Sequence, residues 1–226
     1  MIYEDEGYLL SKRKFRENAN IINVFTSKYG KMSGIVYGGN SRKIRNYLQI
    51  SNKIFIFYTA KNENKIGYFK TELIKPVSPK YFNDKRRTTT LLSLTSLLSL
   101  LLPDLQPNNK IYISLEKLIE NFNYDNCPLL YIFWELNLIK ELGFDPNFKD
   151  ISKNFVSKNN LVKLNIDGIN YIIPTFILTN TIPETYENSL IKKSLIFTRS
   201  LMSNKFFLPN NLILPRTRVL LESYFN

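Results

Sequence analysis

The sequence ANIINVFTSKYGKMSGIVYGG, residues 19–39, predicts two adjacent β-strands near the start of the chain. Residues 21–27 and 31–37 are rich in β-branched and aromatic side chains, and Tyr29 and Gly30 between them are typical of a turn. Segments of the same character occur at residues 8–14, 53–59 and 67–75. Five short, closely spaced strands predict a small barrel, and an OB-fold or an SH3-like barrel fits this pattern.

The pattern becomes helical after Pro76 and Pro79, which bracket a short linker. Apolar residues at four-residue spacing around Trp134 indicate a helix that ends at Gly143. Helices are expected at residues 81–102, 111–122, 129–142, 184–207 and 216–225. We therefore predict an α+β chain: a five-stranded OB-fold β-barrel at residues 1–78, then a mainly α-helical domain at 79–226.

A short irregular or β-like insertion is expected around residues 151–173 of the helical domain. Residues 161–166 and 171–173 are rich in Leu, Val and Ile, and Asp167-Gly168 between them is a common hairpin turn. These two segments therefore predict a β-hairpin.

Positive charge is concentrated in the predicted barrel. The chain carries a formal net charge of +12, and residues 12–53 contain ten cations and a single acid, Glu17. We call this segment the basic window. Clustered charge of one sign favours a polyanion such as nucleic acid. The alternative is a solvated, lysine-rich surface without a partner.

Residues 38–45, GGNSRKIR, are expected to form a flexible, glycine-led loop whose cations neutralise phosphates. Among the aromatic residues of the basic window, Tyr29, Tyr37 and Tyr47 lie beside turns and cations and could stack on bases. The predicted DNA-binding residues are Lys12, Arg13, Lys14, Arg16, Lys31, Tyr37, Arg42, Lys43 and Arg45.

Several classes of site are disfavoured by residue counts. The chain has no histidine and one cysteine, Cys127, so a common zinc site, an internal disulfide and histidine catalysis are excluded. Neither a P-loop nor a dinucleotide-binding glycine motif is present. We therefore expect a protein that is not an enzyme, with no cofactor, metal or catalytic residue.

A cytoplasmic, nucleoid-associated protein is expected, with no membrane partner. The N-terminal residues lack a signal-peptide pattern, and one cysteine favours a reducing compartment. The most apolar stretch, residues 91–102, is too short to cross a bilayer.

Several ordered motifs resemble the RecO family of bacterial DNA-repair proteins. Near the N-terminus these are DEGYLLSKR at residues 5–13 and GIVYGGNS at residues 34–41. Further along the chain are WEL at 134–136, ELGF at 141–144 and PRTR at 215–218. The resemblance implies an N-terminal OB domain joined to a helical domain. Many members carry a cysteine-rich zinc element after the ELGF segment, but residues 151–171 contain no cysteine here.

The resemblance implies a recombination mediator that binds single- and double-stranded DNA and anneals complementary strands. It further implies contact with the C-terminal tail of single-strand-binding protein (SSB) and, with RecR, loading of RecA on SSB-coated DNA. An acidic tail with a hydrophobic end needs an apolar pocket and cations. The predicted tail-binding residues are Lys192, Arg199, Arg216 and Arg218, with the Trp134 stripe as an apolar face. The main alternative function is a single-stranded RNA-binding or ribosome-associated OB-fold protein.

Overall fold

The computed structural model describes residues 1–39, 41–62, 65–146, 148 and 160–226. Contacts within these ranges divide the chain into two compact units, and each is described by itself. The first unit is Met1–Tyr112 with Pro215–Arg218, and the second is Ile113–Leu214 with Val219–Asn226. The predicted domain boundary between residues 78 and 79 stays a prediction. The two compact units divide the chain at other positions, and residues 79–112 belong to the first unit.

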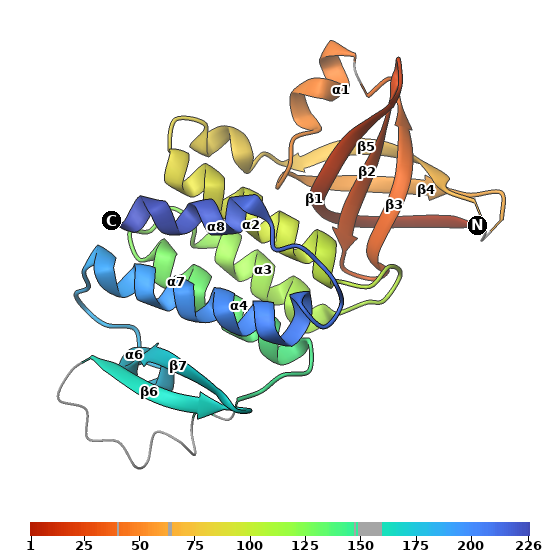
Figure 1. Ribbon diagram of the computed structural model, residues 1–226. Helices are drawn as coiled ribbons and strands as arrows, with labels where there is room; N and C mark the ends of the chain where they lie inside the picture. Colours follow the sequence, from red (N-terminus) through yellow and green to blue (C-terminus); the bar gives the residue numbers. More distant parts are fainter. Residues whose placement is uncertain (40, 63–64, 147, 149–159) are drawn as a thin grey trace. The chain divides into compact units, whose positions relative to one another are not determined.

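The first unit contains a closed five-stranded barrel with the strand order β1-β2-β3-β5-β4 (Figure 1). Strands β3 and β5 run parallel, and every other neighbouring pair is antiparallel. This arrangement is the OB-fold, so the predicted fold class is confirmed. The strands are β1 (Ile2–Arg16), β2 (Ala19–Thr26), β3 (Gly30–Tyr37), β4 (Lys53–Thr59) and β5 (Gly67–Lys75).

Strand β1 links two sides of the barrel because it is 15 residues long and pairs with two neighbours. Residues 2–8 pair with β4, and residues 7–16 pair with β2. The register with β2 shifts between Leu9 and Ser11, which marks a bulge. A bulge bends and twists a strand, and here it lets β1 curve from one partner to the other.

The barrel closes where β3 and β5 meet, at the pairs Gly34 with Gly67 and Ile35 with Tyr68. A Cβ atom on Gly34 would lie 2.5 Å from the ring of Phe69, and one on Gly67 would lie 2.5 Å from the ring of Tyr58. Glycine therefore leaves room for two aromatic rings that fill the barrel at this seam.

Helix α1 (Arg42–Tyr47) packs its apolar side chains against the barrel core. The expected loop at residues 38–45 is therefore wrong from Arg42 onward. Two features override the loop signal of the glycines. The Ser41 side chain accepts a hydrogen bond from the Ile44 amide, which caps the helix, and Ile44 packs against the core. The following residue, Leu48, is completely buried.

Helix α2 (Lys85–Leu101) belongs to the first unit and begins later than the predicted residue 81. Asp84 caps it by accepting a hydrogen bond from the Arg87 amide at 2.9 Å. Helix α3 (Asn109–Glu120) begins in the same unit. There the Tyr112 ring contacts the rings of Tyr8 and Phe25 at centroid distances of 5.9 and 5.5 Å, so this end of β1 and β2 is covered.

The second unit is mainly helical, with its core between α4 and α7. The buried Thr198 hydroxyl on α7 donates to the buried Glu135 carboxylate on α4 at 2.6 Å. The π-helix η2 directly follows α7. The remaining elements are α4 (Cys127–Glu141), α6 (Thr175–Thr179), α7 (Asn188–Met202), η2 (Ser203–Phe207), η3 (Glu222–Phe225) and the last residues of α8 (Arg216–Leu221).

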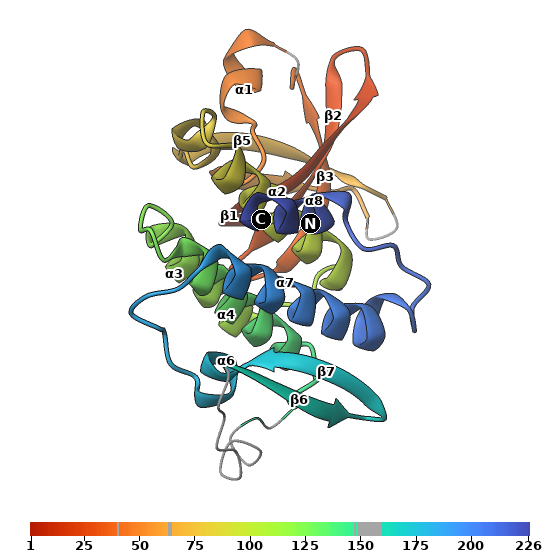
Figure 2. The same cartoon turned by 60° about the vertical axis from the view of Figure 1, so that its left-hand side comes forward.

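The predicted hairpin is confirmed: β6 (Leu161–Ile166) and β7 (Ile169–Pro174) pair in antiparallel fashion around the turn Asp167-Gly168. Both turn residues have positive φ, 49° and 83°, as this turn requires. Strand β7 packs against α7, which Figure 2 shows from the side. Residues 151–159 of the expected insertion lie outside the described residues.

Polar contacts secure the tip of this hairpin. Lys205 pairs with Asp167 and lies over the ring of Phe144, with 4.4 Å between the ammonium and the ring centroid. The Asn204 amide also donates to the Tyr171 hydroxyl at 2.9 Å. Within the described ranges, no group of three or more Cys, Asp or Glu side chains could hold a metal. The described residues therefore do not fit the zinc element that many members of the family carry.

Of the helices in the part of the chain that the structure describes, none combines the length and hydrophobicity that a membrane span requires.

The barrel seam predicts a specific stability defect. The substitution Gly34→Ala is expected to lower the free energy of unfolding by about 1–3 kcal/mol, because the new methyl group overlaps the Phe69 ring. The same substitution in a Phe69→Leu background is expected to cost less, because the smaller side chain leaves room. Urea unfolding of the four proteins of this double-mutant cycle measures the coupling. Strictly additive effects would contradict the proposed steric conflict.

Candidate nucleic-acid interface

The outer face of the barrel carries arginines of β1 beside an apolar floor. Residues 22 and 24 of β2 point into the core, so Ile21 and Ala19 point outward. Arg13 pairs with Ile21 and Arg16 pairs with Ala19, and directly paired residues share a face. Both arginines are exposed. They therefore border a floor formed by Ala19, Ile21 and Ile35.

Two tyrosines continue this surface. Tyr37 pairs with Ala19, and Tyr68 pairs with Ile35. Their rings stack with centroids 5.3 Å apart and an interplanar angle of 23°. Although their rings stack on each other, Tyr37 and Tyr68 remain 55% and 40% exposed. Such an exposed aromatic pair beside arginines is suited to stacking against nucleobases.

The pKa of the Tyr37 hydroxyl depends on two neighbours, Tyr68 and Arg16. A hydrogen bond with the Tyr68 side chain is the main cause that raises the pKa of Tyr37, with desolvation adding to it. The positive charge of Arg16 acts in the opposite direction. Tyr37 therefore keeps its phenolic proton at neutral pH, and Arg16 lies close enough to influence it.

A second group of cations lies on α1. Arg42, Lys43 and Arg45 are all exposed, while Ile44 and Tyr47 of the same helix pack on the barrel. This division follows from the helical period, because every third or fourth residue returns to one face. The helix thus directs three cations to solvent with no acid among its residues.

Lys12 and Lys14 differ in their roles although they share one face of β1. The Lys12 ammonium donates to the Leu48 carbonyl at 2.8 Å, which ties β1 to the end of α1. Burial, followed by repulsion from Arg45, lowers the pKa of Lys12. Lys14 is exposed and is available to a polyanion.

Lys31 contributes to the packing of the first unit rather than to its exposed surface. Its ammonium donates to the Ser99 carbonyl at 2.8 Å and pairs with Asp104 at 3.3 Å, and only 11% of its side chain is exposed. These contacts hold the Lys31 ammonium within the fold, so they do not support a contact between Lys31 and DNA. The structure brings together on the outer barrel face the cations Arg13 and Arg16 and the predicted ring, Tyr37.

Tyr68 was not among the DNA-binding residues predicted from the sequence. It lies in a segment with alternating burial, and Phe69 beside it fills the core, so period-two alternation does place Tyr68 outside. Its position next to Tyr37 depends on the parallel pairing of β3 with β5, which local sequence does not encode.

Gly39 of the predicted glycine-led loop has a packing role, because a Cβ there would lie 2.4 Å from the Asn20 side chain.

The predicted tail-binding cations divide between the two units. In the second unit Lys192 donates to the Asn226 side chain at 2.6 Å, and Arg199 pairs with Glu222 at 2.7 Å. In the first unit Arg216 is exposed, whereas Arg218 is 0% exposed. This burial does not support a contact between Arg218 and an incoming peptide, so the role of Arg218 stays a prediction. Trp134 is also buried, which makes its stripe part of the core.

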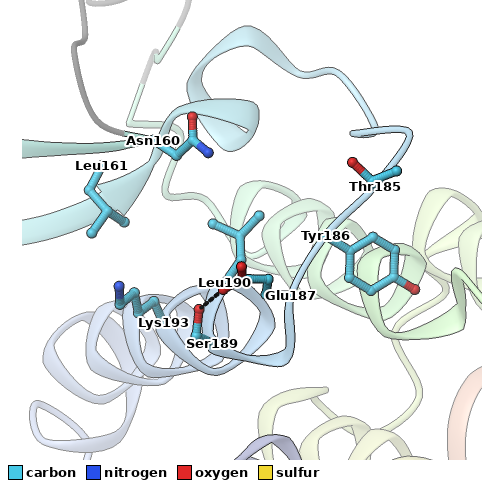
Figure 3. A pocket seen from close by; sticks show the side chains of 8 residues that line it. All are labelled: Asn160, Leu161, Thr185, Tyr186, Glu187, Ser189, Leu190 and Lys193. Carbon is cyan, nitrogen blue, oxygen red and sulfur yellow. Dashed lines mark hydrogen bonds between the residues drawn. The ribbon is translucent and has the colours of Figure 1, made fainter.

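A pocket of about 750 Å³ lies in the second unit beside the start of α7 (Figure 3). Glu187 accepts a hydrogen bond from the Ser189 hydroxyl at 3.2 Å, and Lys193 supplies a cation. One acid therefore accompanies one cation, and the predicted tail-binding residues do not line this pocket. The described lining residues are Asn160, Leu161, Thr185, Tyr186, Glu187, Ser189, Leu190 and Lys193.

Comparison with known proteins gives consistent matches. The family model "Recombination protein O N terminal" matches residues 1–77, and "Recombination protein O C terminal" matches residues 83–157. DNA repair protein RecO of Roseobacter denitrificans is 33% identical over 145 residues, which are 64% of this chain and 60% of that protein. DNA repair protein RecO of Wolbachia pipientis wMel is 28% identical over 161 residues, covering 70% of this chain and 66% of that protein.

The matched segment thus spans 60% of the Roseobacter protein's length. A solved structure of asparaginyl-tRNA synthetase from Entamoeba histolytica covers 95% of this chain and 59% of its own, with a TM-score of 0.30 and 12% identity. A likeness this weak carries no argument about fold or function. The two family models, in contrast, follow one another without overlap across most of the chain, which belongs to the recombination protein O (RecO) family.

Proposed function

We propose that this chain is a DNA-binding recombination mediator in DNA repair, acting through binding and without catalytic turnover. The observation that carries this proposal is the set of exposed cations on the barrel and α1: Arg13, Lys14, Arg16, Arg42, Lys43 and Arg45. Phosphate contacts by such cations give affinity with little sequence preference. Family membership and the names of the relatives support DNA as the polyanion.

The proposed activity extends to both single- and double-stranded DNA. A surface that neutralises phosphates can lower the repulsion between two strands, which supports annealing of complementary strands. With RecR, the protein would help load RecA on SSB-coated DNA. These partners come from the family resemblance, and a cytoplasmic, nucleoid-associated location belongs to the same proposal.

The charge on α1 predicts a test of the DNA site. The triple variant Arg42→Glu, Lys43→Glu, Arg45→Glu is expected to weaken binding to any DNA sequence and to reduce the dependence of affinity on salt. Each lost phosphate contact should lower the slope of log affinity against log salt by about 0.7 for single strands and about 0.9 for duplex. Fluorescence anisotropy at several salt concentrations measures both quantities.

A matched control is the double variant Lys110→Glu, Lys117→Glu on α3, which changes exposed lysines outside the basic window. The control should lose less affinity per reversed charge than the α1 variant. An α1 variant that folds normally and keeps the native affinity and salt slope would contradict the proposed site. Clearly tighter binding of RNA than of DNA by the native protein would favour the RNA-binding alternative.

For the SSB tail, we propose that Lys192 and Arg199 of the second unit and Arg216 of the first unit remain candidate cations. Arg216 is exposed, and the guanidinium fork suits a carboxylate. Replacing Arg216 with Ala is expected to weaken binding of an acidic tail peptide about two- to fivefold, the range for an exposed ion pair. Titration of labelled peptide into the full chain measures this change, with Lys163→Ala on β6 as the control. Equal affinities for both variants and the native protein would remove Arg216 from the site.

A further inference from the structure

The turn between β1 and β2 contains a small pocket on the barrel. Its volume is about 400 Å³, which falls within the range of about 300–1,000 Å³ for pockets that bind small organic groups. One side chain that lines it, Tyr37, belongs to the exposed aromatic pair described above. The lining residues are Arg16, Glu17, Asn18, Ala19, Tyr37 and Gly38.

The lining of this pocket includes an aromatic ring, that of Tyr37, and one small apolar residue, Ala19. Because the Tyr68 ring stacks on Tyr37 at 5.3 Å, the phenol is supported from one side. Ala19 is 1% exposed and belongs to the apolar floor of the outer face. Tyr37 lines the pocket and stays 55% exposed, so a planar aromatic group can approach its ring.

The charges around the pocket favour a base over a phosphate at this position. Glu17 lines the pocket and its carboxylate repels a phosphate, whereas Arg16 can stack on a ring or attract the backbone beside it. Arg16 already lies over the Phe15 ring, 5.3 Å from its centroid. Arg13 on the same face supplies a further contact for the adjoining phosphates.

We propose that this pocket holds an unpaired nucleobase of single-stranded DNA, stacked on Tyr37. Bases in a duplex are paired and stacked on their neighbours, so they cannot enter without being extruded. The pocket therefore adds a preference for single strands to a surface whose cations bind both forms. This inference rests on the proposed function, because the cations must first hold the DNA backbone.

The test separates base stacking from phosphate binding. The full chain is titrated with two labelled single strands of equal length and charge, one with normal bases and one with an abasic sugar–phosphate backbone. The native protein is expected to bind the base-containing strand more tightly. Tyr37→Ala is expected to weaken binding of that strand roughly 5- to 150-fold, the range for loss of one base stack. Affinity for the abasic strand and both salt slopes should stay unchanged.

Two variants control for structural effects. Tyr37→Phe keeps the ring and removes only the hydroxyl, so it should retain the base preference. Tyr124→Ala removes another exposed tyrosine, 62% exposed and in the second unit, and should change neither affinity. Circular dichroism and melting confirm that each variant is folded.

Each remaining outcome contradicts a distinct claim. If native protein binds the two strands equally with a steep salt slope, the base pocket is wrong while the proposed DNA binding stands. Equal losses for both strands in Tyr37→Ala would assign Tyr37 a general role in the surface and would also overturn the pocket. If the native protein binds neither strand, the proposed function fails and the base pocket fails with it. A base preference found with RNA but not with DNA would overturn DNA as the occupant.

Discussion

The close approach of β3 and β5 is the constraint on which the rest of this structure depends. Gly34 and Gly67 face one another across the seam, and the Phe69 and Tyr58 rings occupy the space that their side chains would take. Without this seam the five strands would form an open sheet. The same parallel pairing places Tyr68 beside Ile35 and hence against Tyr37. Barrel closure and the exposed aromatic pair thus have a common origin.

Charge is arranged on this barrel in two ways. Some cations of the basic window hold the fold, since Lys12 bonds the end of α1 and Lys31 bonds Ser99 and Asp104. Others point to solvent from β1 and α1, where they can exchange counterions for phosphates. A count of basic residues therefore overstates the binding surface, because only side chains that reach solvent can neutralise a backbone.

Much of the fold could be predicted from the sequence, since barrel strands and long helices are local patterns. Strand alternation and the Asp167-Gly168 turn predicted the hairpin correctly. Helix α1 could not be predicted from the glycines before it, because its stability depends on Ile44 and Tyr47 packing on a core formed by distant strands. The burial of Arg218 likewise depends on tertiary packing, because the sequence around it is typical of an exposed helix end.

The central claim is that DNA contacts the outer barrel face beside the β1–β2 turn. Photo-crosslinking of the full chain to single-stranded DNA carrying 5-bromodeoxyuridine, followed by mass spectrometry, tests this most directly. The account predicts crosslinked peptides that contain Tyr37 or Tyr68, which disappear when unlabelled single strand competes. Crosslinks confined to residues 113–214 of the second unit, with none on the barrel strands, would contradict it.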